Sequence, residues 1–379
     1  MVRRPTATST RVGPQRLYAS VRESGTMEGH QRGDAVAVGG NARERYYDSS
    51  GYGRPDGAGV VLSVVEAAHL LYRDDLDAVD GRDFGAFLAA NADSVVPFLV
   101  YGDLRERGFY VTPAGEDRVE SPGDVDFVVH PRGDGPWDGT VAYRIRVVDE
   151  RADVALADLG DVVLAVVDEE SEITYLETDR RAPTGSTEMT LEEPATGVLL
   201  DDRVLCPDPP AALYERGFYG QRMNGAGGTL QLSLLEASYL ADGGDLVVDG
   251  VSEERRSSAD SSGRGPGAHA DEVRSRGRAV EGDRFDRRLA VYRHLRERGV
   301  VPKTGFKFGA DFRTYAAVDH VEDLGHSELL VRVLPASTAR SPRDVALDVR
   351  LAHGVRKRMV FALVDGDDVE WVGVGRLTP

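Results

Sequence analysis

The sequence predicts a mixed α/β protein built from two tandem repeats. Five segments of the first half return in the same order in the second half, which chance matching does not explain. Within each half, stretches with apolar residues at helical spacing alternate with short apolar runs typical of strands. Helices between strands, with a fully apolar strand in each copy, favour an α/β or α+β fold over an all-β sandwich.

The paired segments locate the repeats and one insertion. They are YYDSSGYGRPDGAG (46–59) with LYERGFYGQRMNGAG (213–227), LSVVEAAHL (62–70) with LSLLEASYL (232–240), VYGDLRERG (100–108) with VYRHLRERG (291–299), DVAL (153–156) with DVAL (344–347), and LAVVDEESEITYLE (164–177) with FALVDGDDVEWVG (361–373). Glu66 and Glu236 are 170 residues apart, whereas Val100 and Val291 are 191 apart, so the second copy contains an insertion at 252–282. Because this segment is rich in Ser, Gly, Arg and Asp and lacks apolar periodicity, it predicts a flexible surface loop.

The elements of each copy follow from local patterns. In each copy we expect one helix, at 63–72 in the first copy and at 233–240 in the second, and then a second helix that ends at the glycine of LRERG. Strands are expected at 125–130, 143–148, 162–167, 329–334 and 359–364. The resulting organisation is a disordered arm (1–27), the N-terminal and C-terminal subdomains of repeat 1 (28–80, 81–180), a linker (181–196), and the same two subdomains of repeat 2 (197–251, 283–379), separated by the insertion. Met27 could be the true start.

Composition limits the class of protein. The 379 residues carry 46 basic and 64 acidic side chains, a net charge of −18, and lysine occurs only at Lys303, Lys307 and Lys357. This acid excess favours a protein of a high-salt cytoplasm, whereas a GC-rich genome would explain the few lysines but not the extra acids. The single cysteine, Cys206, excludes an internal disulfide and a cysteine-based zinc site. No apolar run approaches the ~18 residues of a membrane helix, and no signal peptide is recognisable, so we expect a cytoplasmic location without a membrane partner.

The two copies differ where chemistry is expected. All three lysines lie in the second copy, and aligning 165–168 with 362–365 puts Gly160 opposite Lys357. The second copy is therefore predicted to carry the activity and the first to be structural. Tyr315, His326 and Lys357 are its candidate catalytic residues, because each lies beside a predicted strand of that copy. Each residue alone also has a structural explanation, as strand-end core, cap or solvated surface.

Together the three side chains suit metal-free cleavage of RNA. An internal 2′-hydroxyl attacks the adjacent phosphate, so one group must take its proton, another must protonate the departing 5′-oxygen, and a cation must stabilise the added charge. Imidazole titrates near neutrality and an ammonium donates three hydrogen bonds, whereas a phenol is a weak base unless a cation activates it.

At these residues the chain resembles the archaeal tRNA-splicing endonucleases (tRNA-intron endonucleases), in particular the tandem-repeat homodimers. The resemblance rests on YRHLRERGVVPKTGFKFGADFRTY (292–315), HSELLVRV (326–333), RLAHGVRKRMVFALVD (350–365) and YGQRMNGAGGTLQLSLLEASYL (219–240), and it covers 28–379 apart from the insertion. It implies a restriction-endonuclease-like C-terminal subdomain in each repeat. It also implies that the chain cleaves precursor tRNA at the bulge-helix-bulge of the intron boundaries, leaving 2′,3′-cyclic phosphate and 5′-hydroxyl ends.

The resemblance further assigns roles to residues. Tyr315 would be the general base, His326 the general acid and Lys357 the stabilising cation, while Arg350 and Arg376 would sandwich a bulged base of the RNA. An acidic loop of the inactive copy would dock on the partner subunit of a homodimer; here it is Asp168, Glu169, Glu170 and Glu172.

Two other functions remain open at this stage. A metal-dependent nuclease of the restriction type would need acidic ligands close to its lysine, but Val355 and Arg356 precede Lys357. A non-catalytic RNA-binding subunit would suit the first copy by itself. The chain has no GxGxxG motif and no HxxxH or paired-carboxylate cluster, so we expect neither a nucleotide cofactor nor a metal.

Overall fold

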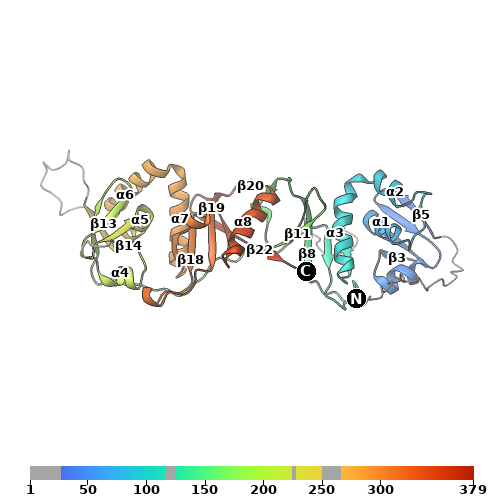
Figure 1. Cartoon of the computed structure of the whole chain (residues 1–379), viewed down its shortest axis with the longest axis horizontal. Helices are drawn as coiled ribbons and strands as arrows, with labels where there is room; N and C mark the ends of the chain where they lie inside the picture. The colour runs from blue at the N-terminus through green and yellow to red at the C-terminus, as the bar shows by residue number, and fades with distance from the viewer. Residues whose placement is uncertain (1–26, 116–123, 224–227, 250–265) are drawn as a thin grey trace, which may run out of the picture.

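A computed structural model of the chain describes residues 27–115, 124–223, 228–249 and 266–379. The described part is elongated, with the N-terminal subdomains of the two repeats at its two ends and the C-terminal subdomains between them (Figure 1). The predicted disordered arm lies, apart from Met27, outside the described residues. The first fourteen residues of the predicted insertion, 252–265, also lie outside them.

Each N-terminal subdomain is a five-stranded sheet that carries one nine-residue helix, and that of repeat 2 also has the short helix α4. In repeat 1 the strand order is β3-β4-β2-β1-β5, and in repeat 2 it is β14-β15-β13-β12-β16. The bounds are β1 Glu28–Arg32, β2 Ala35–Val38, β3 Arg54–Asp56, β4 Gly59–Ser63, α1 Val64–Tyr72 and β5 Ala78–Val79, and then β12 Ala195–Leu199, β13 Arg203–Cys206, α4 Ala211–Glu215, β14 Gln221–Arg222, β15 Leu230–Ser233, α5 Leu234–Asp242 and β16 Leu246–Asp249. Ser63 and Ser233 start α1 and α5 with the same capping box, closed by Glu66 and Glu236.

The C-terminal subdomains share one ten-stranded sheet. Its order is β17-β18-β19-β21-β22-β11-β10-β8-β7-β6, so each repeat gives five strands and the antiparallel pair β22–β11 joins them. The bounds are β6 Val111–Pro113, β7 Phe127–Val129, β8 Tyr143–Asp149, β10 Val163–Val167, β11 Ile173–Asp179, β17 Val301–Thr304, β18 Phe312–Tyr315, β19 Leu329–Pro335, β21 Arg358–Asp365 and β22 Asp368–Leu377. A further pair, β9 Val154–Ala155 with β20 Ala339–Arg340, also links the repeats. The runs predicted as buried strands, β10 and β21, lie inside this sheet.

Helices cover the sheets. The first repeat contributes α2 Phe84–Ala90 and α3 Val95–Glu106, and the second contributes α6 Pro266–Glu281, α7 Asp283–Glu297 and α8 Pro342–Gly354. One apolar core lies in each repeat, and a third lies between α8 and the strands on both sides of the repeat junction. Both predicted LRERG helices are present, as α3 and α7.

The prediction of a flexible loop is wrong for the last part of 252–282. Residues 266–281 form α6, which packs on α5 with Ala270 and Val273 fully buried. Gly277 continues this face, because a Cβ there would lie 2.3 Å from the ring of Phe285. The buried stripe is narrow, and between residues 271 and 281 most of the other side chains are charged. Composition therefore concealed a helix that tertiary packing stabilises.

The predicted linker has no regular secondary structure between β11 and β12, but it packs on repeat 2. The backbone N–H groups of Gly185, Ser186 and Thr187 donate to the carbonyl oxygens of Arg298, Ala316 and Gly299. The linker thus passes beside Tyr315, the neighbour of Ala316.

In the part of the chain that the structure describes, no single helix is long and apolar enough to cross a membrane. Residues 84–106 meet the length and composition of a span only as the pair of α2 and the helical residues after it, which bends by 106°. That pair packs in the core of repeat 1 through Phe87, Phe98 and Leu104.

Candidate active site

The ends of three neighbouring strands meet at one edge of the shared sheet. Tyr315 is the last residue of β18, His326 lies three residues before β19, and Lys357 directly precedes β21. In the register of the sheet Thr314 pairs with Leu329, and Leu329 pairs with Arg358. The three predicted catalytic residues therefore belong to adjacent chain segments at the same level of the sheet.

The end of α8 fixes the position of Lys357. The N–H groups of Arg356 and Lys357 donate to the carbonyl oxygens of His353 and Ala352, both over 2.9 Å, which is a Schellman motif. The motif requires a left-handed residue, and Arg356 adopts φ 57° although it is not glycine. Lys357 Nζ then donates to the carbonyl oxygen of Ser327, next to His326. Burial, and secondly the nearby Arg313 guanidinium, lower the pKa of the Lys357 amine.

Tyr315 and His326 have opposite environments. The Tyr315 side chain is 7% exposed and packs with Phe218, Val301 and Val318. The ring of Phe218 meets it edge-on with 5.6 Å between centroids, and the Arg313 guanidinium lies 5.7 Å from the Tyr315 ring centre. His326 is solvent-exposed at the surface of the same edge. The phenol is therefore buried and the imidazole is open to solvent.

Repeat 1 has the same strand ends but different side chains. Counting along the equivalent strands puts His130 at the position of Tyr315, Thr140 at that of His326 and Gly160 at that of Lys357. His130 is buried, and its two ring nitrogens are 2.9 Å from Thr112 Oγ1 and 2.8 Å from the carbonyl oxygen of Thr140. In repeat 1 a buried histidine thus stands where repeat 2 has the phenol, and a glycine stands where repeat 2 has the amine.

The two predicted RNA-binding arginines line one cavity of about 530 Å³ between α8 and the repeat junction. Arg350 reaches it from α8 and Arg376 from β22, and Asp168 and Glu172 line it from repeat 1. Met359 pairs with Val374, so the same register continued by two residues puts Arg376 level with Lys357.

The residues of the predicted acidic loop have different roles in the structure. Asp168 Oδ1 accepts the backbone N–H groups of Glu170 and Glu172, both over 2.9 Å, and so holds the turn between β10 and β11. Glu169 pairs with Arg151 of its own repeat. Among the described residues, the exposed Glu170 and Glu172 carboxylates have no ion-pair partner within the chain.

Sequence reasoning missed a buried ion pair behind Tyr315. Lys303 Nζ lies 2.9 Å from Glu236 Oε1, and both side chains are almost fully buried. Burial opposes ionisation of Glu236, but Lys303 and the N–H groups of Ser233 and Gly220 hold its pKa at about 2. The signal in the sequence was the position of Lys303, where the first copy has Thr112.

Within the described ranges, no three His, Cys, Asp or Glu side chains gather in a way that could hold a metal ion. The triad edge contains one imidazole, one phenol and one amine. Any metal bound there would lack the clustered carboxylates that metal-dependent nucleases use.

Comparison with known proteins agrees with the duplicated architecture. The family model described as the tRNA intron endonuclease catalytic C-terminal domain matches residues 285–371, in the second repeat. The model of the N-terminal domain of the same family matches twice, at 27–88 and 195–260. The match to the catalytic domain therefore falls on the copy that contains the phenol, imidazole and amine.

Three similar proteins are each named tRNA-splicing endonuclease. The one from Natronomonas pharaonis is 69% identical over 354 residues, and the one from Haloarcula marismortui is 58% identical over 356; each alignment covers 93% of this chain and all of the relative. The one from Methanosarcina mazei is 37% identical over 369 residues, with 91% of this chain and 97% of the relative covered. Fold, site and comparisons define an endonuclease made of two α/β repeats. The chain belongs to the tRNA intron endonuclease family.

Proposed function

We propose that this endonuclease cuts precursor tRNA at the bulge-helix-bulge of its intron boundaries, by a reaction that uses no metal ion. The observation that carries the proposal is the meeting of Tyr315, His326 and Lys357 at three adjacent strand ends of repeat 2. The same strand ends in repeat 1 lack the phenol and the amine. The substrate class is inferred from the names of the relatives.

The proposed reaction is an internal displacement at phosphorus. The ribose 2′-oxygen attacks the adjacent phosphorus, and the bond from that phosphorus to the 5′-oxygen of the next nucleotide breaks. Tyr315, as the phenolate, accepts the proton of the 2′-hydroxyl and becomes the neutral phenol, and His326, as the imidazolium, donates a proton to the departing 5′-oxygen. The products are a 2′,3′-cyclic phosphate and a 5′-hydroxyl. Because His326 is exposed, it can regain its proton from solvent.

Two cations support this displacement. The Lys357 ammonium is held beside His326 by its hydrogen bond to Ser327, and it would stabilise the charge that develops on the phosphoryl oxygens. Arg313 would place a second positive charge beside the phenolate that acts as the base, since its guanidinium lies 5.7 Å from the Tyr315 ring centre. A bound phosphate would in turn offset the repulsion between the two cations.

Arg350 and Arg376 would hold the RNA by stacking on a bulged base. A guanidinium is planar and always charged, so two of them can enclose a base by cation–π contact and pair with the flanking phosphates. Their common cavity, and the level of Arg376 in the sheet next to Lys357, support this role.

We further propose that the active form is a homodimer in which Glu170 and Glu172 of one subunit dock on the other. Besides these carboxylates, α8 and the residue that follows it expose an apolar stripe at helical spacing, with Leu347, Leu351 and Val355 each about two-fifths to one-half exposed. An exposed apolar stripe of this kind is suited to a protein interface.

One experiment separates this function from the two others considered. A bulge-helix-bulge RNA is incubated with the full chain in EDTA, and the product ends are identified. Cleavage to cyclic phosphate ends supports the proposal. Loss of cleavage in EDTA with recovery in Mg²⁺ would indicate a metal-dependent nuclease, and RNA binding without cleavage under both conditions would indicate a scaffold.

Variants then test the residues. His326→Ala and Lys357→Ala should each slow single-turnover cleavage about 100-fold or more while RNA binding persists. His30→Ala is the matched control, because His30 is an exposed histidine of repeat 1 paired with Asp80. Full activity of the His326→Ala variant would contradict the assigned role.

A further inference from the structure

We propose that Phe218, in the N-terminal subdomain of repeat 2, is a positioning residue for Tyr315, and that Lys303 anchors it. The inference rests on the proposed catalytic role of Tyr315. It assigns the N-terminal subdomain a part in the reaction, because Phe218 and the carboxylate that binds Lys303 both come from that subdomain.

The first observation is a left-handed backbone conformation that both copies adopt at this turn. In the first copy the residue is glycine, whereas in the second copy it carries a side chain and the backbone is strained. Phe218 has φ 49°, in the left-handed region that aromatic residues avoid. Its counterpart in the paired segments is Gly51, with φ 68°. The turn itself is the same, since the N–H of Phe218 donates to the backbone carbonyl oxygen of Tyr214. In the same way, the N–H of Gly51 donates to the backbone carbonyl oxygen of Tyr47. The second repeat therefore keeps a phenylalanine where glycine would relieve the strain.

The second observation is an exchange of volume between the copies. A Cβ added to Gly51 would lie 2.7 Å from the ring of Tyr110, so Tyr110 fills this space in repeat 1. Tyr110 corresponds to Val301 in the second copy. The smaller Val301 leaves room for the Phe218 ring, which packs against both Val301 and Tyr315.

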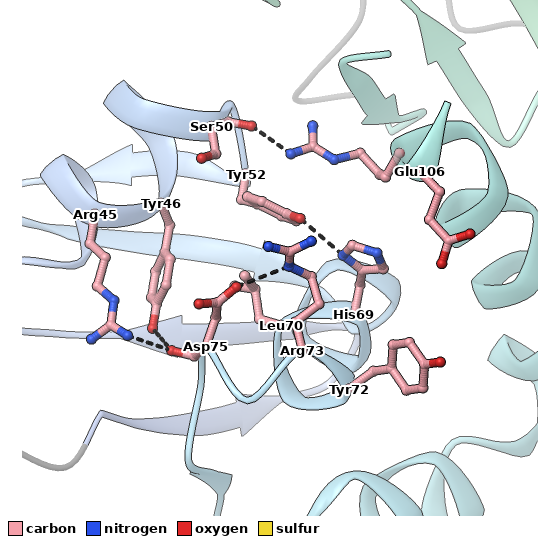
Figure 2. A pocket seen from close by; sticks show the side chains of 11 residues that line it. Arg45, Tyr46, Ser50, Tyr52, His69, Leu70, Tyr72, Arg73, Asp75 and Glu106 are labelled. Carbon is pink, nitrogen blue, oxygen red and sulfur yellow. Dashed lines mark hydrogen bonds and ion pairs between the residues drawn. The ribbon is translucent and has the colours of Figure 1, made fainter. Parts of the chain in front are cut away.

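Figure 2 shows the equivalent turn of repeat 1, at Ser50 and Tyr52, in the copy that lacks the phenol and the amine. There Arg105 of α3 donates to the carbonyl oxygen of Ser50, and the Tyr52 hydroxyl lies 2.9 Å from His69 Nδ1. The equivalent arginine of repeat 2, Arg296, donates to Gly217 in the same manner. The arginine-to-carbonyl bond at this joint is thus made in both copies, and in repeat 1 it is made with glycine at the position of Phe218. Holding the joint together does not explain Phe218.

The third observation is the anchor. Lys303 Nζ donates to the carbonyl oxygens of Phe218 and Gly220, over 3.1 and 2.9 Å, and to Glu236 Oε1. The same Nζ lies 4.8 Å from the centre of the Phe218 ring. The carbonyl oxygens on both sides of Tyr219 are thus fixed by Lys303, and the N–H of Gly220 is fixed because it donates to Glu236. Two of the ammonium hydrogen bonds therefore hold the turn that carries Phe218, and the third goes to the Glu236 carboxylate of α5.

These contacts define how the residue would act. The edge-on contact of Phe218 closes one side of the pocket around the Tyr315 ring, while Val301 on β17 pairs with Tyr315 across the sheet. Removing the ring would let the phenol move, and misplacement of a catalytic group by about 1 Å can cost 10²-fold in rate. Phe218 would thus act through Tyr315, without touching the substrate.

The test compares Phe218→Gly with Phe218→Tyr. Gly is the residue that repeat 1 uses at this turn, so the Phe218→Gly variant should fold, with the backbone strain relieved. We expect single-turnover cleavage of bulge-helix-bulge RNA to fall about 10-fold or more at saturating RNA, with RNA affinity unchanged. Phe218→Tyr, which keeps the ring, should restore most of the rate. Phe285→Leu is the control for lost packing, because Phe285 is fully buried away from Tyr315 and should affect melting but not the rate.

A double-mutant cycle keeps the two proposals distinguishable. If Phe218 acts through Tyr315, adding Phe218→Gly to Tyr315→Phe should cause no further loss of rate. A Phe218→Gly variant with the wild-type rate, or full additivity with Tyr315→Phe, would overturn the positioning role while leaving Tyr315 catalytic. An active Tyr315→Phe variant would instead remove the catalytic role itself, and with it this inference.

Discussion

Arg358 of the second repeat reaches across β22 to Asp179 of the first, with Nη2 2.6 Å from Oδ2, and its Nη1 lies 2.9 Å from Glu177 Oε1. The strand between them has glycine at the crossing points. A Cβ on Gly375 would lie 2.9 Å from the Glu177 carboxylate, and one on Gly373 would lie 3.0 Å from Asp179. A side chain of the second repeat, next to Lys357 in the chain, thus binds two carboxylates of the first repeat.

We therefore predict that Arg358→Met destabilises the junction. Asp179 is 17% exposed, so its partly desolvated carboxylate would lose its nearest cation, and the free energy of unfolding should fall by about 1–2 kcal/mol. Arg181→Met is the control, because the Arg181 side chain is 88% exposed and comes no closer to the same carboxylate than 3.9 Å. Urea unfolding of both variants measures the difference, and equal stability would show that the bridge contributes nothing.

The left-handed residue before Lys357 gives a second prediction. Glycine adopts φ 57° without a steric penalty, so Arg356→Gly should leave the stability unchanged or raise it by up to about 1 kcal/mol. Arg356→Val should lower it by about 1–2 kcal/mol and slow cleavage, because a β-branched residue disrupts the Schellman motif that fixes Lys357. Calorimetric melting and single-turnover rates of the two variants test this. A Val variant as active as the Gly variant would separate the helix end from catalysis.

Local patterns could predict the elements on which the candidate site is built. Ser63 and Ser233 mark helix starts by their own side chains, and the apolar runs of β10 and β21 indicate buried strands wherever their partners lie. Because the three candidate residues flank predicted strands, their position at strand ends followed from the chain alone. Their catalytic roles stay predictions.

Features that depend on distant partners could not be predicted in this way. The pairing of β11 with β22 joins residues about 200 positions apart, and nothing local specifies it. In α6 a stripe of Ala270, Val273 and Gly277 is apolar enough only when α5 and Phe285 complete it. The left-handed Phe218 violates a local preference, and only the fold shows what its ring touches.

The pH dependence of stability provides a third prediction. Burial first, then the positive charges of Arg105 and Arg73, lower the pKa of His69 to about 4. In the unfolded state the pKa of this histidine is about 6.5. Between pH 4 and 6.5 its side chain therefore binds a proton in the unfolded state but not in the folded state. Stability should therefore be full above pH 6.5 and decline as pH falls towards 4, by up to about 3 kcal/mol from this residue.

The second copy supplies the matched variant for this measurement. Tyr239 lies at the position of His69, so His69→Tyr should fit an aromatic ring there and flatten the stability profile between pH 6.5 and 4. Urea unfolding at several pH values compares the two proteins. An unchanged slope in the variant would assign the pH dependence to other groups.

The last prediction separates the residues of the acidic loop. Glu170 and Glu172 are exposed, so the double change Glu170→Gln and Glu172→Gln should leave the melting temperature of a monomeric form unchanged. If they dock on a partner, the same change should weaken the dimer at least tenfold, measured by light scattering across a dilution series. Asp168→Ala should instead lower thermal stability, because its carboxylate accepts two backbone N–H groups of the turn. A dimer that persists unchanged in the double variant would show that the loop does not dock, whereas loss of dimer in every variant would indicate that the shape of the turn matters more than its charge.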